Sequence, residues 1–379
     1  MHLAALTQTI EQARRKAIDI LATIAGGDNP AEAKRKIRDE MVFSEMFDEY
    51  MERHAKVNKR SWDQDLQNFN FHLRDQLGNK KLSSIDRRDV RAIHERLTKR
   101  GTRTAANRVL ALISIIYAKA IEREYATVSP AAGIKLNKEQ SRDRFLQADE
   151  LPRFFESLAA EENEKMRDFF LLALLTGARR RAVAAMHWRD ISLERAEWRI
   201  QLTKNGLPQT VHLSPEAINI LTNRKLTSVS IFVFPAKSKT GYVVEPKDAW
   251  RRILDRDELA QLTKRIKEVN IEFEQDTTAL LSQNLREAHE LADKMKINRN
   301  GARMQDLHIH DLRRTLGSWQ AAGASLSVIG KSLNHSSVST TAIYARLNLD
   351  PVRESVNRAT ANMFATLGET QNLLQFRKS

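Results

Sequence analysis

Apolar side chains recur at intervals of three and four residues along most of this 379-residue chain. That spacing places them on one face of an α-helix, so each such segment predicts an amphipathic helix. Glycine and proline, which interrupt helices, are sparse at 13 and 8 residues. The pattern is clear through residues 42–128, where we expect one compact helical unit. A chain of this length has room for two domains or three.

Strand-like sequence occurs only in the middle of the chain. EWRIQLT (197–203) and TVHLS (210–214) flank a Lys-Asn-Gly turn, and Asn-Gly is a strong hairpin signal. SIFVFP (230–235) is either a third short strand or a buried connection. The expected fold class is therefore mainly α, with a small antiparallel β-sheet in the second half.

The polar, charge-rich segment 134–144 follows Pro130 and Gly133 and is predicted to be an interdomain linker. It divides the chain into an N-terminal helix within 1–40, a helical domain at 41–133 and a second domain at 145–379. Within the second domain, residues 255–298 predict a helical insertion, either a hairpin or an extended helix pair. Its two apolar stripes comprise Leu259, Leu262, Ile266, Val269 and Phe273, and then Leu281, Leu285, Ala288, Leu291, Ala292 and Met295.

The net charge is +14 and the isoelectric point about 9.9, which favours a nucleic-acid partner over a merely basic soluble protein. Basic residues gather near two helix ends and the turn between them, and each is nearly as compatible with an ordinary solvated position. The candidates for DNA contact there are Lys99, Arg100, Arg103 and Arg108. The chain has no cysteine, which excludes disulfides and is compatible with a reducing cytoplasm. It has no signal-peptide pattern, and its longest unbroken apolar run, 169–175, is too short to cross a bilayer.

Four short stretches carry the polar groups that suggest chemistry. They are TGARR with Arg179, TKNG with Lys204, HIHDLRRT with His310 and Arg313, and LNHSSVSTTAIYA with His335 and Tyr344. His310 and Arg313 share a helical face, and Arg313 is expected beside the buried residues Leu312, Leu316 and Trp319. Asp311, its near neighbour, is expected to point elsewhere. Two partly buried arginines without an obvious acidic partner predict a phosphate clamp, because the guanidinium fork binds two oxygens at once.

Such a clamp gives Tyr344 a role. Positive charge from Arg179 and Arg313 would favour the phenolate and stabilise a pentavalent transition state. Attack on a phosphodiester would leave a covalent phosphotyrosine, and Lys204 would protonate the leaving oxygen. His310 and His335 would orient oxygens or accept the tyrosine proton. This scheme requires no metal and no cofactor.

These motifs, in this order, resemble those of the tyrosine recombinase (phage integrase) family, especially integrases of prophages and genomic islands. The resemblance covers about 145–360, and residues 42–128 are similar to the family's helical core-binding domain. It implies a mixed α/β catalytic domain whose catalytic residues are Arg179, Lys204, His310, Arg313, His335 and Tyr344. Arg180 joins the candidates for DNA contact.

The same resemblance implies a nucleoid-associated cytoplasmic enzyme that cuts and rejoins double-stranded DNA at attachment sites through a 3′-phosphotyrosine. Four protomers would act on two duplexes, with accessory DNA-bending or directionality factors. Residues 359–369 resemble the tail helix lent to a neighbouring protomer, and the N-terminal segment resembles the end of an arm-binding domain.

Three features depart from the family pattern. Ala182 replaces an acidic residue, Asn334 replaces glycine in Leu-Gly-His, and most relatives lack the insertion at 255–298. Two other functions stay open. One is a DNA-binding protein of the same fold with weak or no catalysis, and the other is a type IB topoisomerase-like enzyme that nicks and religates. A metal-dependent nuclease is a remote further possibility.

Overall fold

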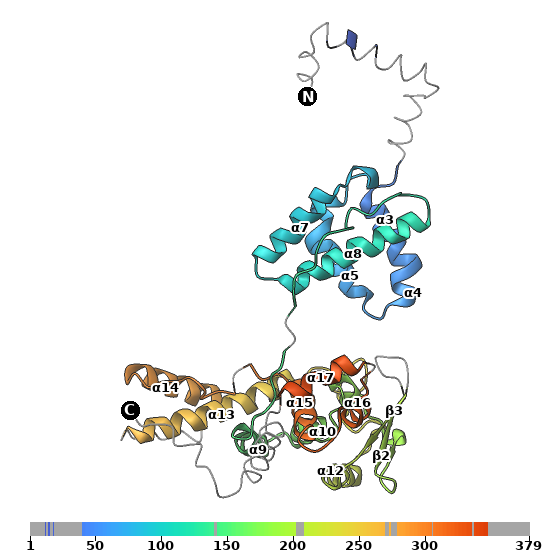
Figure 1. Cartoon of the computed structure of the whole chain (residues 1–379). Coiled ribbons are helices and arrows are strands. Elements are labelled where there is room, and N and C mark those ends of the chain that lie inside the picture. The colour runs from blue at the N-terminus through green and yellow to red at the C-terminus, as the bar shows by residue number, and fades with distance from the viewer. Residues whose placement is uncertain are drawn as a thin grey trace, which may run out of the picture. The chain divides into compact units, whose positions relative to one another are not determined.

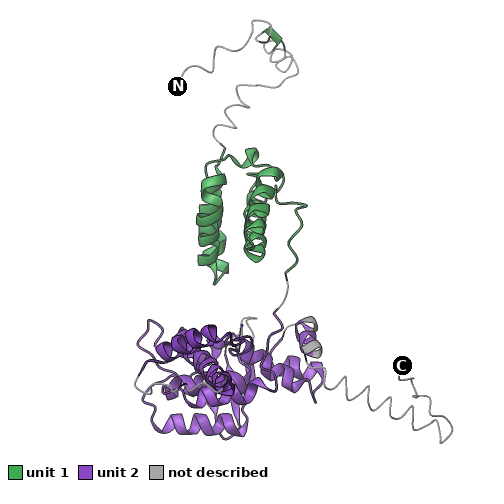
Figure 2. Cartoon of the chain, turned by 90° about the vertical axis from the view of Figure 1, so that its left-hand side faces the viewer, with its two compact units in different colours: residues 1–141 green, residues 142–379 purple. Residues whose placement is uncertain are grey.

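The computed structural model of the chain forms two compact units, residues 1–141 and 142–379, coloured separately in Figure 2. The structure describes residues 40–139, 142–201, 208–269, 273, 279–304, 306–335 and 337–347, with Gln12, Arg14, Arg15 and Ile18. The expected tail helix lies outside the described residues. So does the N-terminal helix, apart from those four helical and exposed positions.

The regular elements among the described residues of the first unit are all helices, with one isolated bridge between Val42 and Lys81 (Figure 1). Asp86 is the N-cap of its α7, and the carboxylate of Asp86 accepts hydrogen bonds from the amides of Arg88 and Asp89 at 2.8 and 2.9 Å. The hydroxyl of Tyr117 donates to the carbonyl oxygen of Leu82 at 3.0 Å across the core. The elements are α3 (Phe43–Tyr50), the π-helical turn Met51–Ala55, α4 (Lys56–Asn58), α5 (Trp62–Asn68), the π-helical turn Phe69–Leu73, α6 (Arg74–Leu77), the 3₁₀ turn Leu82–Ser84, α7 (Arg87–Lys99) and α8 (Arg103–Glu122).

Helix α8 is long and apolar enough, by length and composition alone, to cross a membrane. However, half of the most apolar stretch of this helix is buried inside the first unit. Val109, Ile113 and Ile116 are each at most 1% exposed there. We therefore interpret α8 as the core helix of this unit.

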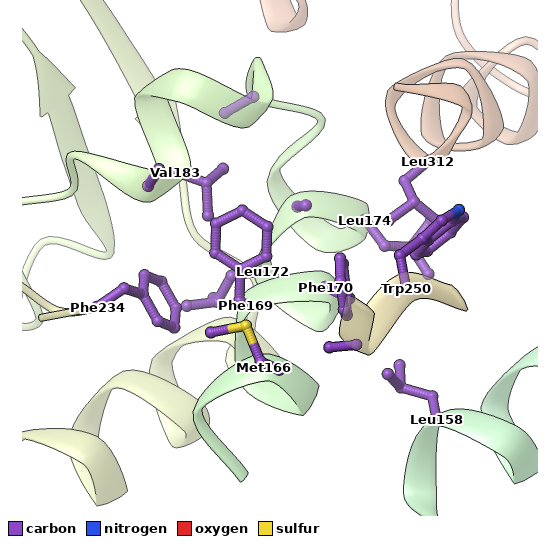
Figure 3. Packing of buried hydrophobic residues seen from close by; sticks show 14 of the residues in the cluster. Leu158, Met166, Phe169, Phe170, Leu172, Leu174, Val183, Phe234, Trp250 and Leu312 are labelled. Carbon is purple, nitrogen blue, oxygen red and sulfur yellow. The ribbon is translucent and has the colours of Figure 1, made fainter. Parts of the chain in front are cut away.

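The second unit is built around α10 (Glu164–Thr176). Figure 3 shows Phe169 and Phe170 of this helix packed between Phe234, Trp250 and Leu312, which come from distant parts of the sequence. The other helices are α9 (Glu150–Ala159), α11 (Arg180–Ala184), the 3₁₀ turn Trp188–Asp190, α12 (Pro215–Leu226), α13 (Lys247–Glu268), α14 (Leu281–Lys294), α15 (Asp311–Gln320), α16 (Leu326–Ser332) and α17 (Val338–Leu347).

A three-stranded antiparallel sheet in the order β1-β2-β3 lies in the second unit. The predicted pair is present as β2 (Glu197–Ile200) and β3 (Gln209–His212), and Trp198 faces Val211 across them. The sequence did not indicate β1 (Ile191–Ser192). Segment 230–235 adds no strand to this sheet. Of the two predicted alternatives, a third strand or a buried connection, the second is present. Val233 and Phe234 are at most 1% exposed, and the segment forms only isolated bridges, at Phe232 and Pro235.

The predicted helical insertion is a pair of packed helices, α13 and α14, which lie side by side in Figure 1. Their shared core contains Leu259, Leu262, Ile266, Ala288 and Ala292, as the two apolar stripes predict. The stripes are wrong at their ends, because Val269 is 50% exposed and Met295 is 46% exposed. Both residues are C-caps, where the helix stops and no facing turn remains to cover them.

Candidate active site

Arg313 lies at the base of the candidate site, on the first turn of α15, and its predicted burial is confirmed at 4% exposure. Its guanidinium group is held by main-chain oxygens. Nη1 donates to the carbonyl of Gly177 at 2.7 Å, and Nη2 donates to the carbonyl of Leu333. Asp311 points elsewhere, as expected, and pairs with Arg142 and Arg314. No carboxylate pairs with Arg313 among the described residues, so its positive charge remains available to an anion.

Arg179 approaches the same place from the turn that follows α10. It caps the N-terminus of α11, two residues after Gly177, and is half-buried. Burial, followed by the charge of Arg179, lowers the pKa of Arg313 to about 10. The two guanidinium groups therefore lie near enough to repel each other. An anion between them would relieve this repulsion, which is the arrangement a phosphate clamp requires.

Tyr344 projects from α17 into the same cluster and is 3% exposed. Its side chain lies beside the guanidinium group of Arg313. Its ring lies parallel to that of His335, with the ring centroids 5.8 Å apart and the planes 5° from parallel. The ring occupies the space left by Gly317, where an added Cβ would stand 2.6 Å from Tyr344 Cε1. Because Gly317 has no side chain, the ring of Tyr344 can pack directly against the backbone of α15.

The effect of this environment on Tyr344 differs from our expectation. Arg313, Arg314 and Arg179 do favour the phenolate, but burial outweighs them, and the pKa of Tyr344 is raised above its usual value. The expectation of a favoured phenolate is therefore wrong for the protein alone. The physical reason is that a packed ring loses more hydration of its charged form than the neighbouring cations return.

His310 and His335 both have their pKa lowered to about 4. Loss of hydration is the largest cause for each, and the adjacent guanidinium groups add to it: Arg314 first for His310, and Arg313 first for His335. His310 is exposed as a residue, whereas His335 is half-buried. Nδ1 of His335 lies 3.0 Å from the hydroxyl oxygen of Thr341. Both imidazoles are therefore neutral at pH 7 and able to accept a proton.

The structure gathers five of the six predicted catalytic residues in one protomer: Arg179, His310, Arg313, His335 and Tyr344. The sixth, Lys204, lies outside the described residues, between β2 and β3. Their catalytic roles stay predictions.

The residues expected to contact DNA lie on both units. Arg180 is half-buried, and its Nη2 lies 3.8 Å from Glu245 Oε1. Four are exposed on the first unit, at the end of α7 and in α8, namely Lys99, Arg100, Arg103 and Arg108. Contact with DNA remains a prediction for all five.

One predicted core residue of α15 is misplaced. Leu312 is fully buried and Leu316 is half-buried, but Trp319 is 47% exposed. Its indole nitrogen donates to the carbonyl of Leu146 at 3.4 Å. The indole covers the chain entering the second unit instead of packing into the core.

Three residues that shape the site escaped the sequence analysis as site residues. Gly177 has φ +57°, and an added Cβ would stand 2.7 Å from Leu333, so only glycine fits the turn between α10 and Arg179. Gly317 is a glycine inside a helix, a signal of close approach. Asn334 has φ +51°, the left-handed conformation that asparagine tolerates better than most residues. The family's glycine position is therefore occupied by a compatible substitute.

These two units reproduce a known architecture. The fold is similar to that of a lambda integrase dimer bound to a COC′ core site, with a TM-score of 0.59 and 17% identity, covering 88% of this chain and 87% of that chain. A lambda integrase tetramer bound to a Holliday junction gives a TM-score of 0.59 at 16% identity, covering 89% and 88%. The fold is therefore lambda integrase-like.

Sequence comparison gives the particular family. The profile of the phage integrase family matches residues 144–350, and that of the phage integrase central domain matches residues 43–137. Because the first match alone covers more than half of the chain, the protein belongs to the phage integrase family.

Two Escherichia coli strain K12 proteins are similar to shorter parts of the chain. Prophage integrase IntF is 30% identical over 126 residues, which is 32% of this chain and 27% of IntF. Prophage integrase IntZ is 25% identical over 249 residues, 60% of each chain. The matched region thus spans about a quarter of one relative and three-fifths of the other.

Proposed function

We propose that this protein is a site-specific DNA recombinase that cleaves and rejoins DNA through a covalent 3′-phosphotyrosine at Tyr344. One observation carries the proposal: a buried tyrosine lies beside a buried arginine that lacks a carboxylate partner among the described residues, and a second arginine lies close by. Family membership supports the same chemistry.

In the proposed reaction, the Tyr344 hydroxyl oxygen attacks the phosphorus of a DNA phosphodiester. A bond forms between phosphorus and the tyrosine oxygen, and the bond from phosphorus to the 5′ oxygen breaks. Arg179 and Arg313 bind the non-bridging oxygens and stabilise the charge that develops on them. A 5′ hydroxyl of the partner strand then attacks the phosphotyrosine, which restores the phosphodiester and releases Tyr344.

Proton transfer follows from the pKa of each group. Because burial keeps Tyr344 protonated, its attack requires a base. His310 and His335 are neutral at pH 7 and are the candidate acceptors. The negative charge of a bound phosphate would raise the low pKa of both rings and make each a stronger base. Lys204, in the segment between β2 and β3, is assigned as the acid that protonates the leaving 5′ oxygen.

The proposed partner is double-stranded DNA at attachment sites. Four protomers would assemble on two duplexes, with accessory DNA-bending or directionality factors, in the cytoplasm at the nucleoid. The solved lambda integrase complexes, a dimer on a core site and a tetramer on a Holliday junction, support such an assembly by analogy of fold. The exposed cations at the end of α7 and in α8, together with Arg180, would bind phosphates.

The direct test is a suicide half-site DNA substrate, in which the short fragment that carries the new 5′ hydroxyl dissociates after cleavage, so that religation is prevented. The native chain should form a covalent protein–DNA product that survives denaturing electrophoresis. Tyr344→Phe keeps the ring and removes the oxygen, so it should bind the DNA and form no such product. Covalent product from Tyr344→Phe would refute the nucleophile. Specific binding without product from either chain would favour the DNA-binding alternative.

A second measurement separates recombination from simple nicking and religation. Two full attachment sites should yield junction intermediates and exchanged products. Relaxation of supercoiled DNA without junctions would favour the topoisomerase-like alternative.

The DNA contacts of the first unit are tested by salt dependence. Removing one cation that binds a phosphate should flatten the slope of log K against log salt by about 0.9 for duplex DNA. Replacing Arg103 and Arg108 by glutamine should therefore reduce the slope by about 1.8 while leaving thermal stability unchanged, because both side chains are exposed. An unaltered slope would remove these two residues from the proposed interface.

A further inference from the structure

The chain entering the second unit runs along α15, the helix that carries Arg313. Three contacts hold it there. Arg142 Nη2 donates to Asp311 at 3.1 Å, the amide of Leu146 donates to the hydroxyl of Thr315 at 3.0 Å, and the indole of Trp319 donates to Leu146. We call residues 142–146 the strap. Its three partners are spaced four residues apart, so they form one stripe along the helix.

Asp311 is the strongest point of attachment. Its carboxylate is fully buried and accepts hydrogen bonds from Arg142, from Arg314 and from the amide of His308 at 2.8 Å. A buried carboxylate is stable only when it is paired in this way. Arg142 also binds Asp306, at 2.8 Å, but that side chain is 71% exposed and the pair is open to water. Of the two carboxylates held by Arg142, Asp311 is therefore the one that fixes the helix.

The opposite side of α15 carries the candidate site. Arg313 and Gly317 are each two residues from a strap contact, so they project about 200° around the helix from that stripe. Arg313 binds Gly177 and Leu333 and lies beside Tyr344, and Gly317 contacts the Tyr344 ring. One helix is thus held between the strap and the proposed nucleophile. A shift on the strap side displaces the guanidinium group on the other.

We propose that Arg142 is a positioning residue, which holds α15 through Asp311 and so sets the placement of Arg313 beside the reacting phosphate. This inference rests on the proposed function of the site and adds a residue outside the expected catalytic set. Arg142 acts through the helix and not on the phosphate itself. Arg142 is the first residue of the second unit, so the proposed positioning contact lies where the chain enters that unit.

The test compares Arg142→Ala with Asp306→Asn in the full chain. The first removes one of the two cations that pair with buried Asp311, the one that ties the strap to α15, whereas the second weakens only the exposed pairing of Arg142. Under single turnover at saturating half-site DNA, Arg142→Ala should form the covalent product about tenfold to a hundredfold more slowly, because misplacement by about 1 Å can cost about a hundredfold. Asp306→Asn should remain within about twofold of the native rate. Arg142→Lys should recover part of the rate, since one ammonium group still reaches one carboxylate.

Two further measurements exclude simpler causes. DNA affinity should change by less than about twofold in Arg142→Ala, and a loss of affinity with a flatter salt slope would instead make Arg142 a phosphate contact and overturn the inference. Thermal denaturation should show that Arg142→Ala is folded at the assay temperature, and a rate loss that only follows the unfolded fraction would overturn it too.

Amide hydrogen exchange provides a readout that does not depend on catalysis. Exchange in residues 311–320 should accelerate in Arg142→Ala and remain native-like in Asp306→Asn. Unchanged exchange together with a native cleavage rate would refute the positioning role. If the native chain forms no covalent product, the proposed function fails, while the exchange comparison still decides whether Arg142 holds α15.

Discussion

The close packing of the Tyr344 ring on Gly317 predicts that Gly317→Ala lowers activity far more than it lowers stability. In Gly317→Ala, the added methyl group would stand 2.6 Å from Tyr344 Cε1, 2.8 Å from Cζ and 2.9 Å from Leu333 Cδ1. Ordinary contacts of this kind begin at 3.4 Å, so the tyrosine ring must move by about 0.8 Å. The hydroxyl, at the far end of the ring, then leaves its position beside Arg313.

The two consequences differ in size. Misplacement of a reacting group by about 1 Å can lower a rate about a hundredfold. Overpacking typically costs about 1–3 kcal/mol in unfolding free energy. The higher helix propensity of alanine offsets about 0.5–1 kcal/mol of that cost. We therefore expect Gly317→Ala to remain folded while its covalent product forms about a hundredfold more slowly.

The assay is a time course of covalent product on half-site DNA at saturating concentration, paired with denaturant unfolding of the same samples. Gly323→Ala is the matched control, because its added Cβ would have no neighbour within 4 Å. It should cleave at the native rate. A native rate in Gly317→Ala would show that the Tyr344 ring accommodates the added methyl group and keeps its reactive position. That result would refute the reasoning.

Three other predictions follow from single environments. Asn334→Val places a β-branched residue at φ +51° and should destabilise the fold by about 1–3 kcal/mol in denaturant unfolding, whereas Asn334→Gly should be nearly neutral; equal effects would contradict the backbone argument. His310 and His335 have a folded pKa of about 4, below the unfolded value of 6.5, so the unfolded chain binds more protons between these values and stability should fall as pH drops from about 6.5 to 4. Nuclear magnetic resonance titration checks this, and midpoints near 6.5 would exclude it. Arg153→Met leaves the 1% exposed Asp257 without the cation that binds it through two 2.8 Å hydrogen bonds, and should cost about 3–5 kcal/mol in denaturant unfolding; a loss below about 1 kcal/mol would show that water or another cation replaces it.

The sequence predicts the helices of this protein well because apolar spacing reports directly which face is buried. It also predicts the burial of Arg313, since that residue lies beside Leu312 in the helical pattern. It predicts less well where a helix ends. Val269, Met295 and Trp319 continue apolar stripes in sequence but lie where no neighbouring element covers them.

The raised pKa of Tyr344 could not be predicted from the sequence, for a different reason. Charge can be counted from sequence, so the influence of Arg179 and Arg313 on the phenol is predictable. Burial depends on which residues lie opposite, and here one close neighbour is Gly317, which contributes no side-chain atoms of its own. The strap contacts of Arg142 are equally invisible, since they join residues 164 and 169 positions apart.

The carbonyl groups that hold Arg313 have a consequence for how the site responds to its surroundings. Main-chain oxygens do not titrate, and no single side-chain replacement deletes them. Acidification, which would release an arginine tethered by carboxylates, leaves the contacts to Gly177 and Leu333 intact for as long as the turns that present them persist. The orientation of the Arg313 guanidinium group is thus set by the path of the backbone, and it changes only when the backbone itself moves.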